Sequence, residues 1–163
     1  MAGRAASTNP TIVGAVIDAR IRAEPIVWLT TMAPTGRPCV VPTWFSWDGR
    51  AFRIFTKPTA RKLRNIACNP HVMLALGDPH ADFDVVLVEG EACAEPPAIA
   101  AETVDRHLSR YRLQLSAIGL EREGYLRTYS ATMRIEPTRV LGWSGRSHLA
   151  RGTDAGHISQ PQL

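Results

Sequence analysis

The chain of 163 residues is 45% hydrophobic and 21% charged, a composition typical of one globular domain with its own core. No apolar run approaches the roughly 20 residues that a membrane helix needs, and the N-terminus lacks the apolar stretch of a secretory signal, so we expect a cytoplasmic protein. The net charge of +4 suits an anionic ligand but is too small to indicate nucleic-acid binding by itself.

The first part of the chain predicts one helix followed by antiparallel strands. Apolar residues recur near helical spacing over residues 10–22 and predict an amphipathic helix. Turn residues at 34–37 and the favoured hairpin turn Asp48-Gly49 separate the apolar runs that follow. Three consecutive antiparallel strands are therefore predicted, at residues 26–33, 38–47 and 51–56.

After the third predicted strand, the spacing of the apolar residues changes to that of a helix. Leu63, Ile66 and Ala67 share one helical face, which predicts a short helix over residues 59–68 with Thr59 as its N-cap. A helix is also expected over residues 97–113, and a short helical or irregular segment between Gly119 and Gly124. The remaining strands are predicted at residues 71–76, 84–92 and 131–143.

These elements predict a mainly β fold with peripheral helices. The early connections are short turns, which excludes a parallel βαβ sheet. A closed antiparallel barrel of six strands removes exposed strand edges and is the simplest arrangement. We expect one barrel domain over residues 10–143, with tails at residues 1–9 and 144–163.

The cysteines, the histidines and the glycine-containing motifs that often mark catalytic or metal-binding sites form no known pattern in this sequence. Cys39, Cys68 and Cys93 stand singly and indicate neither a disulfide framework nor a zinc site, so each is expected to be a small buried hydrophobe. The five histidines lack metal-like spacing, and no metal is expected. The G-x-S-x-G and G-x-G-x-x-G motifs are absent, which argues against a serine hydrolase and a Rossmann nicotinamide site.

Four cations crowd the start of the predicted helix after the third strand. They are Lys57, Arg61, Lys62 and Arg64. The first turn of a helix has free backbone N–H groups and the positive end of the helix dipole, so cations there repel unless an anion joins them. The cluster therefore favours a phosphate site. Two other interpretations stay open: a solvated face of a surface helix, and nucleic-acid binding, for which basic–aromatic interleaving is missing.

Three segments of the chain resemble a known family. LTTMAPTGRPCVVPTWFSWDG, FTKPTARKLRNIACNPHVMLAL and DVVLVEGEA, in this order, resemble the flavin and deazaflavin-dependent oxidoreductases of the pyridoxamine 5'-phosphate oxidase-like group, and within it the F420-dependent branch. The resemblance covers residues 11–143, and its most specific part is K-x-R-N-x-x-x-x-P, from Lys62 to Pro70. It implies a homodimeric six-stranded split β-barrel (an FMN-binding split barrel), with the cofactor in a groove at the dimer interface.

The resemblance also implies particular binding residues. Lys62 is the expected phosphate ligand, and Thr43 and Trp44 match positions near the ring system. Pro58 departs from the family, in which Gly-Ser often precedes the helix, and it removes one backbone donor. Supporting phosphate-side candidates are Thr56, Lys57, Arg64 and Asn65.

The activity implied is that of an F420H2-dependent oxidoreductase, which transfers a hydride between reduced deazaflavin F420 and a conjugated, electrophilic small molecule. Because the cofactor carries the hydride, no nucleophilic side chain is required, and no catalytic residue is assigned. The alternatives are an FMN-dependent oxidoreductase of the same fold, a non-catalytic flavin or F420 carrier and, more distantly, an anion-binding regulatory module. Neither nucleic acid nor a membrane is expected as a partner.

Overall fold

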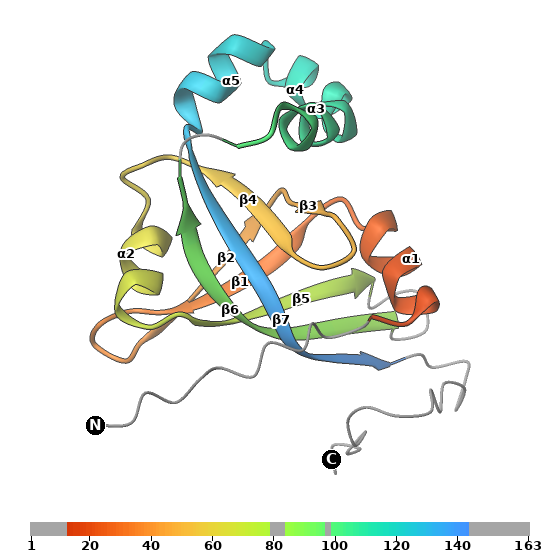
Figure 1. Ribbon diagram of the computed structural model, residues 1–163, viewed down its shortest axis with the longest axis vertical. Coiled ribbons are helices and arrows are strands. Elements are labelled where there is room, and N and C mark those ends of the chain that lie inside the picture. The colour runs from red at the N-terminus through yellow and green to blue at the C-terminus, as the bar shows by residue number, and fades with distance from the viewer. Residues whose placement is uncertain (1–12, 79–83, 97–98, 144–163) are drawn as a thin grey trace.

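A curled antiparallel sheet forms the centre of the molecule (Figure 1). The computed structural model describes residues 13–78, 84–96 and 99–143, so both predicted tails lie outside the described residues. The seven described strands are ordered β2-β1-β5-β6-β7-β4-β3, and every neighbouring pair is antiparallel. Their bounds are β1 (Val27–Met32), β2 (Pro38–Thr43), β3 (Ser46–Trp47), β4 (Phe52–Thr56), β5 (His71–Asp78), β6 (Asp84–Glu95) and β7 (Ala131–Trp143).

The predicted strand at 38–47 is divided in the structure. Only Trp44 and Phe45 separate β2 from β3, yet β2 and β3 stand at opposite ends of the strand order. The chain therefore crosses from one edge of the sheet to the other within this link, which brings the two edges together as a barrel. The mainly β barrel is confirmed, and the division of this segment is the reason that the sheet has seven strands instead of six.

The loop between β3 and β4 is longer than the predicted two-residue turn. Trp47 pairs with Phe52, so the loop consists of residues 48–51. The Asp48 carboxylate accepts the backbone N–H groups of Arg50 and Ala51, both at 2.8 Å. This local hydrogen bonding by an aspartate competes with the tight hairpin that Asp-Gly usually predicts.

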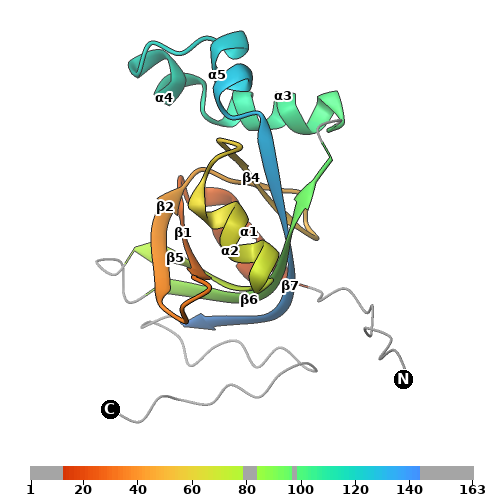
Figure 2. The same ribbon diagram turned by 90° about the vertical axis from the view of Figure 1, so that its left-hand side faces the viewer.

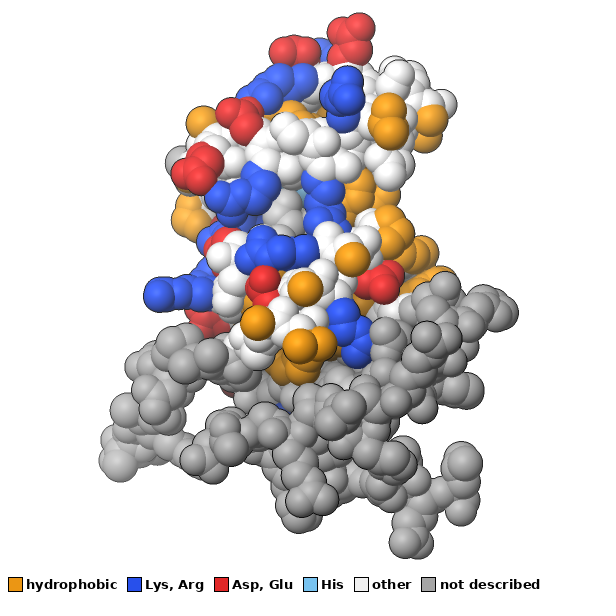
Figure 3. Space-filling model, turned by 90° about the vertical axis from the view of Figure 1, so that its right-hand side faces the viewer, with side chains coloured by type: hydrophobic (Ala, Val, Ile, Leu, Met, Phe, Trp, Pro, Cys, Tyr) orange, Lys and Arg blue, Asp and Glu red, His pale blue; other side chains and the backbone are white. Residues whose placement is uncertain are grey.

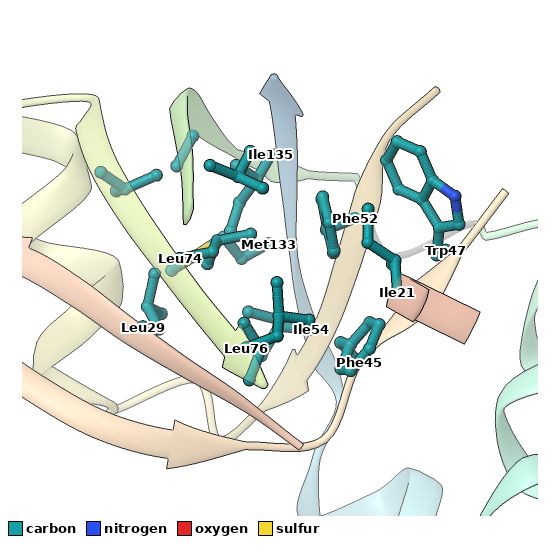
Figure 4. Packing of buried hydrophobic residues seen from close by; sticks show 14 of the residues in the cluster. Ile21, Leu29, Phe45, Trp47, Phe52, Ile54, Leu74, Leu76, Met133 and Ile135 are labelled. Atoms are coloured by element: carbon teal, nitrogen blue, oxygen red, sulfur yellow. The ribbon is translucent and has the colours of Figure 1, made fainter. Parts of the chain in front are cut away.

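The barrel core follows the alternation of the strands. In β1, Val27 and Leu29 are fully buried, whereas Trp28 between them is 49% exposed. Figure 4 shows apolar side chains from β1, β4, β5 and β7 converging, with Ile21 of the first helix among them. Each such side chain contributes roughly 1.5–3 kcal/mol relative to exposure, so the core dominates the stability of the barrel.

One glycine permits the bend in the two longest strands. The register of β6 against β7 shifts between Glu89 and Gly90. A Cβ at Gly90 would lie 2.7 Å from the Glu136 carbonyl oxygen and 2.9 Å from the Ile135 side chain. Only glycine fits this approach, and such a bulge increases the local twist by which a sheet curls.

Five described helices accompany the barrel (Figures 1 and 2). They are α1 (Ala15–Ala23), α2 (Arg61–Cys68), α3 (Ala101–Arg110), α4 (Arg112–Ala117) and α5 (Arg122–Thr128). The helix predicted over 97–113 is thus two helices that meet at Tyr111. Gly119, with φ of 67°, lies before the start of α5, but Gly124 lies inside α5 instead of bounding the predicted segment.

The helices occupy distinct places on the barrel. The helix α2 contacts β6 and β1 and lies within one opening of the barrel, whereas α3, α4 and α5 lie together beyond one end of the barrel (Figures 1 and 2). We call this last group the helical module. On the face that carries α1, basic side chains lie among acidic ones (Figure 3). None of the described helices has both the length and the apolar character required to span a membrane.

Candidate functional site

The basic segment lies where β4 passes into α2. The N-cap of α2 is Ala60, so the prediction of Thr59 at this position is wrong. The Ala60 N–H donates to the Lys57 carbonyl at 3.0 Å, which closes a turn with Pro58 at its second position. Proline favours that position, so the turn delays the helix by one residue. No described side chain caps the helix. The Leu63 N–H donates to the Ala60 carbonyl at 3.1 Å, whereas the N–H groups of Arg61 and Lys62 have no assigned acceptor among the described residues.

The four cations of this segment, which we call the basic cluster, differ in burial. Lys57, Arg61 and Arg64 are exposed, whereas Lys62 is half-buried. Burial lowers the pKa of the Lys62 ammonium, because the charged form loses hydration. Among the ion pairs of the described residues, none includes a cation of this cluster. The cluster therefore has an uncompensated positive charge that an anion would stabilise.

Two further phosphate-side candidates point into the barrel. Thr56 ends β4 and is 3% exposed, and Asn65 of α2 is 1% exposed. The Asn65 amide donates to the Thr31 hydroxyl at 2.8 Å and so fastens α2 to β1. Asn65 therefore lies on the buried side of α2, whereas Ala67, which was predicted on the apolar face, is exposed.

The two residues predicted to lie near the cofactor ring stand where β2 ends: Thr43 is its last residue, and Trp44 follows it. Thr43 is half-buried, and its hydroxyl donates to the Trp44 carbonyl at 3.2 Å. The Trp44 ring stacks on Tyr111, with centroids 4.7 Å apart and planes inclined by 7°. Tyr125 approaches the same ring at 6.1 Å. Trp44 is therefore held from the helical module, a partner that the sequence analysis missed.

The link between β2 and β3 is held by hydrogen bonds from the same module. The Tyr111 hydroxyl accepts the Phe45 N–H and donates to the Phe45 carbonyl, each at 3.0 Å. His107 Nδ1 lies 2.9 Å from the Ser46 hydroxyl, and its Nε2 lies 2.8 Å from the Tyr125 hydroxyl. A neutral imidazole donates one of these bonds and accepts the other. Burial lowers the pKa of His107 to about 4, which keeps the ring neutral near pH 7.

Arg110 also contacts Phe45 of this link, and it connects the helical module to the end of α1. Its guanidinium lies 4.8 Å from the Phe45 ring centroid and donates to the Arg22 carbonyl at 2.9 Å and to the Glu24 carbonyl. Carbonyls at the C-terminus of a helix such as α1 attract cations. The spacing of His107 and Tyr111, one helical turn apart, was the sequence signal for a shared buried face.

Some expectations for single residues are wrong. The cysteines are not buried: Cys39 is half-buried, and Cys68 and Cys93 are exposed. Lone cysteines that are free of packing constraints need not face the core. In the described part of the chain, no three His, Cys, Asp or Glu residues gather in a way that could hold a metal ion.

Comparison with known proteins gives one family and a consistent fold. Residues 14–144 match the family model described as pyridoxamine 5'-phosphate oxidase. No curated protein matches the chain. The solved structure of an F420 reductase is 22% identical with a TM-score of 0.63, covering 79% of this chain and 98% of that chain.

Two other solved structures have different ligands in their names. An FAD-binding protein from Mesorhizobium loti is 19% identical with a TM-score of 0.61, covering 80% of this chain and 92% of that chain. HutZ, a heme storage protein from Vibrio cholerae, is 16% identical with a TM-score of 0.59, covering 78% of this chain and 92% of that chain. At such identities the likeness shows the fold alone.

Proposed function

We propose, since the chain belongs to the pyridoxamine 5'-phosphate oxidase family, that it is an oxidoreductase that binds F420 and transfers a hydride between the reduced cofactor and an electrophilic small molecule. The observation that carries this proposal is Lys62: a half-buried cation in the first turn of an uncapped helix, with no carboxylate partner among the described residues. Such a group is stabilised by a phosphate, which the cofactor would supply.

The residues of the chain would bind and orient this cofactor. Lys62 would bind the phosphate together with the first N–H groups of α2, and Lys57 and Arg64 would add to the local positive potential. Thr56 and Asn65 would support this segment from inside the barrel, where both are buried. When bound, the cofactor supplies the hydride, and the protein supplies orientation and a site with little water.

Thr43 and Trp44 would lie beside the ring system. Because Trp44 already stacks on Tyr111, it presents at most its other face and its edges to a ligand. The stacked tyrosine limits the freedom of the indole, so Trp44 would act as a rigid wall for the ring or for a conjugated substrate.

A second candidate function is FMN-dependent oxidation or reduction at the same site. The likeness of the fold to an FAD-binding protein favours a flavin as much as a deazaflavin. The basic cluster would bind the FMN phosphate in the same way. The likeness to a heme storage protein keeps a third candidate, a carrier that binds its cofactor without turnover.

We also propose that the protein is a homodimer with the cofactor site at the interface. The register places Trp28, Val40 and Met73 on one outer face of β2, β1 and β5, where they are 49%, 55% and 37% exposed. A hollow of about 360 Å³ adjoins Met73, and polar residues such as Thr30 form much of its lining. Large apolar side chains exposed together on one face are typical of an interface, and a second copy would cover them.

The proposal is tested by titrating F420 and FMN separately into the same purified protein. Quenching of F420 fluorescence at micromolar concentration, with weaker binding of FMN, is the expected result. Oxidation of F420H2 that depends on added enones or quinones would then separate an enzyme from a carrier. Binding of neither cofactor would overturn the proposal, and preferential binding of FMN would support the second candidate.

A further inference from the structure

Aromatic rings form a continuous array where the helical module meets the link between β2 and β3. The Trp44 ring stacks on Tyr111 and on Tyr125, with centroids 4.7 Å and 6.1 Å apart. Tyr129 extends the array, because its ring centroid lies 4.7 Å from that of Tyr125. Tryptophan and tyrosine are among the side chains that most readily lose one electron, and rings in contact exchange electrons rapidly. A one-electron oxidation of Trp44 can therefore pass to a neighbouring tyrosine.

The hydrogen bonds of Tyr111 make it a poor end point for such an oxidation. A phenol that loses an electron must also release its hydroxyl proton, so a base has to lie within hydrogen-bond reach. The Tyr111 hydroxyl donates to the Phe45 carbonyl, which is too weak a base to take the proton. The Arg110 guanidinium also donates to this oxygen at 3.2 Å, and its positive charge opposes the loss of an electron. Oxidation of Tyr111 is therefore disfavoured.

Tyr125 has the base that Tyr111 lacks. Its hydroxyl lies 2.8 Å from His107 Nε2, and the two residues are only 2% and 1% exposed. The His107 ring is neutral near pH 7, because burial lowers its pKa to about 4. A phenol is a stronger donor and a poorer acceptor than a serine hydroxyl, so the favoured tautomer has Tyr125 donating to Nε2 and Nδ1–H donating to Ser46. The lone pair of Nε2 thus faces the Tyr125 proton.

Oxidation is the event that would move this proton. Burial raises the pKa of Tyr125, so its hydroxyl stays protonated near neutral pH as long as the ring is not oxidised. A phenol that has lost an electron is a far stronger acid than an imidazolium, even one with a lowered pKa, so the proton then passes to Nε2. The His107 imidazolium can donate to both the Tyr125 oxygen and Ser46, so no hydrogen bond is lost. Burial also keeps water and solutes away from the radical that remains.

We propose that Tyr125 and His107 form a redox-active pair, on which a one-electron oxidation of Trp44 ends as a neutral tyrosyl radical and a protonated imidazole. One electron passes from Tyr125 to the oxidised Trp44 ring, and one proton passes from the Tyr125 hydroxyl to His107 Nε2, so atoms and charge balance. The step needs a one-electron oxidant at Trp44, the chemical class to which light-excited flavins belong. This activity goes beyond the proposed function, and it holds for any such oxidant that reaches the Trp44 ring.

Flash oxidation of the full chain without any cofactor tests the pair. The probe is tris(bipyridine)ruthenium(III), generated by a light pulse, and the parent protein is Trp28→Phe, because Trp28 is 49% exposed and would compete for the oxidant. We expect a long-lived tyrosyl radical in the parent, detected by its absorption and by electron paramagnetic resonance. Adding Tyr125→Phe should abolish this signal. Tyr129→Phe is the matched control and should retain it, since no described group hydrogen-bonds to the Tyr129 hydroxyl.

Removing the base provides a second measurement. His107→Gln keeps Tyr125 and a hydrogen-bonding side chain but supplies no base, so the radical should form at least about a hundredfold more slowly, the smaller effect of losing a positioned base. In the parent, formation should be slower in D2O, and double resonance should detect an exchangeable proton between the phenoxyl oxygen and the imidazole. Circular dichroism melting checks the folding of the variants, and if one does not fold, the two measurements on the parent still test the pair.

The outcomes are independent of cofactor binding, because the oxidant is supplied from solution. A long-lived tyrosyl signal that survives Tyr125→Phe, or a parent in which only tryptophan is oxidised, overturns the inference and leaves the proposed function standing. Equal rates in H2O and D2O, or an unchanged rate in His107→Gln, show that His107 does not accept the proton and also overturn it. A wild type that binds neither F420 nor FMN removes the proposed function alone.

Discussion

Lys62 differs from the other cations of the basic cluster in its burial. Arg61 and Arg64 on the same helix are exposed, and their charges are largely screened by water and salt. The Lys62 ammonium has lost part of its hydration, so a phosphate at this position restores more free energy than a phosphate beside an exposed arginine. At the scale of single residues, affinity for an anionic cofactor should therefore depend most on Lys62.

Substitution tests this difference. Lys62→Ala should weaken binding of F420 or FMN about tenfold to a hundredfold, the range for a hydrogen bond to a charged group. Arg61→Ala, the matched control on the exposed side, should change the affinity by less than about threefold. Because burial lowers the pKa of Lys62 from its ordinary value of 10.5, wild-type affinity should fall as the pH rises through that lowered pKa. If fluorescence titration shows that Lys62→Ala binds the cofactor as tightly as the wild type, Lys62 does not bind the phosphate and the proposed position of the phosphate site is wrong.

His107 determines a pH dependence of stability. In the folded protein burial lowers its pKa to about 4, whereas the unfolded chain has the ordinary value of 6.5. Between these values the unfolded state binds more protons, so the free energy of unfolding falls as the pH is lowered. The loss attributable to this residue should reach roughly 3 kcal/mol below pH 4.

Urea unfolding of the wild type and of His107→Gln at several pH values measures this contribution. The glutamine variant is expected to be less stable at pH 7, because it disturbs the bonds to Ser46 and Tyr125, but to lose less stability on acidification. Parallel pH profiles for the two proteins would show that another group is responsible.

Among the elements, the helical module has the clearest structural task. It contacts both residues of the link between β2 and β3, Trp44 by stacking and Phe45 by hydrogen bonds, and it reaches Ser46 of β3 through His107. The link joins the two edges of the sheet, so the module holds the barrel closed at the point where the chain bends. It also fixes Trp44, through which a distant helix would influence the proposed ring site.

Tyr111→Phe removes one hydroxyl and retains the stacked ring. The buried N–H and C=O of Phe45 then lose their partner, and the free energy of unfolding should fall by about 1–3 kcal/mol. Tyr129→Phe is the control in the same module, since no hydrogen bond is assigned to that hydroxyl among the described residues, and it should change stability by less than about 0.5 kcal/mol. Equal urea midpoints for the two variants would refute the role assigned to the Tyr111 hydroxyl.

For the whole molecule, the exposed outer face of β1, β2 and β5 predicts self-association. Trp28→Asp places a charge in the centre of this face, and it should shift the protein toward monomer in size-exclusion chromatography with light scattering. The control is Val16→Asp on α1, since Val16 is 69% exposed but lies on a different element. A wild type that is monomeric, or a Trp28→Asp protein that stays dimeric, would contradict the proposed interface.

Much of the fold was predictable because it depends on local patterns. Apolar runs predicted the strands at 26–33 and 84–92, and period-two alternation predicted the strand at 131–143. These positions agree with β1, β6 and β7 within a few residues. Turn chemistry located 34–37 correctly, where Gly36 has φ of 81°. The basic cluster was visible because its charges are adjacent in the sequence, and the family resemblance agrees with the family match over residues 14–144.

The sequence by itself determined the mainly β class, the family and the segment that would bind an anion, because alternation, turn residues and neighbouring charges act over a few residues. Only the tertiary structure decided which residues of that segment are buried, since Asn65 turns inward only when Thr31 is there to accept its amide. The tertiary structure likewise decided that residues 38–47 divide between the two edges of the sheet. It also decided that Tyr111 and His107 form hydrogen bonds with Phe45 and Ser46, from which they are more than 60 residues away in the sequence. Contacts at such separation depend on barrel closure, which no local pattern records.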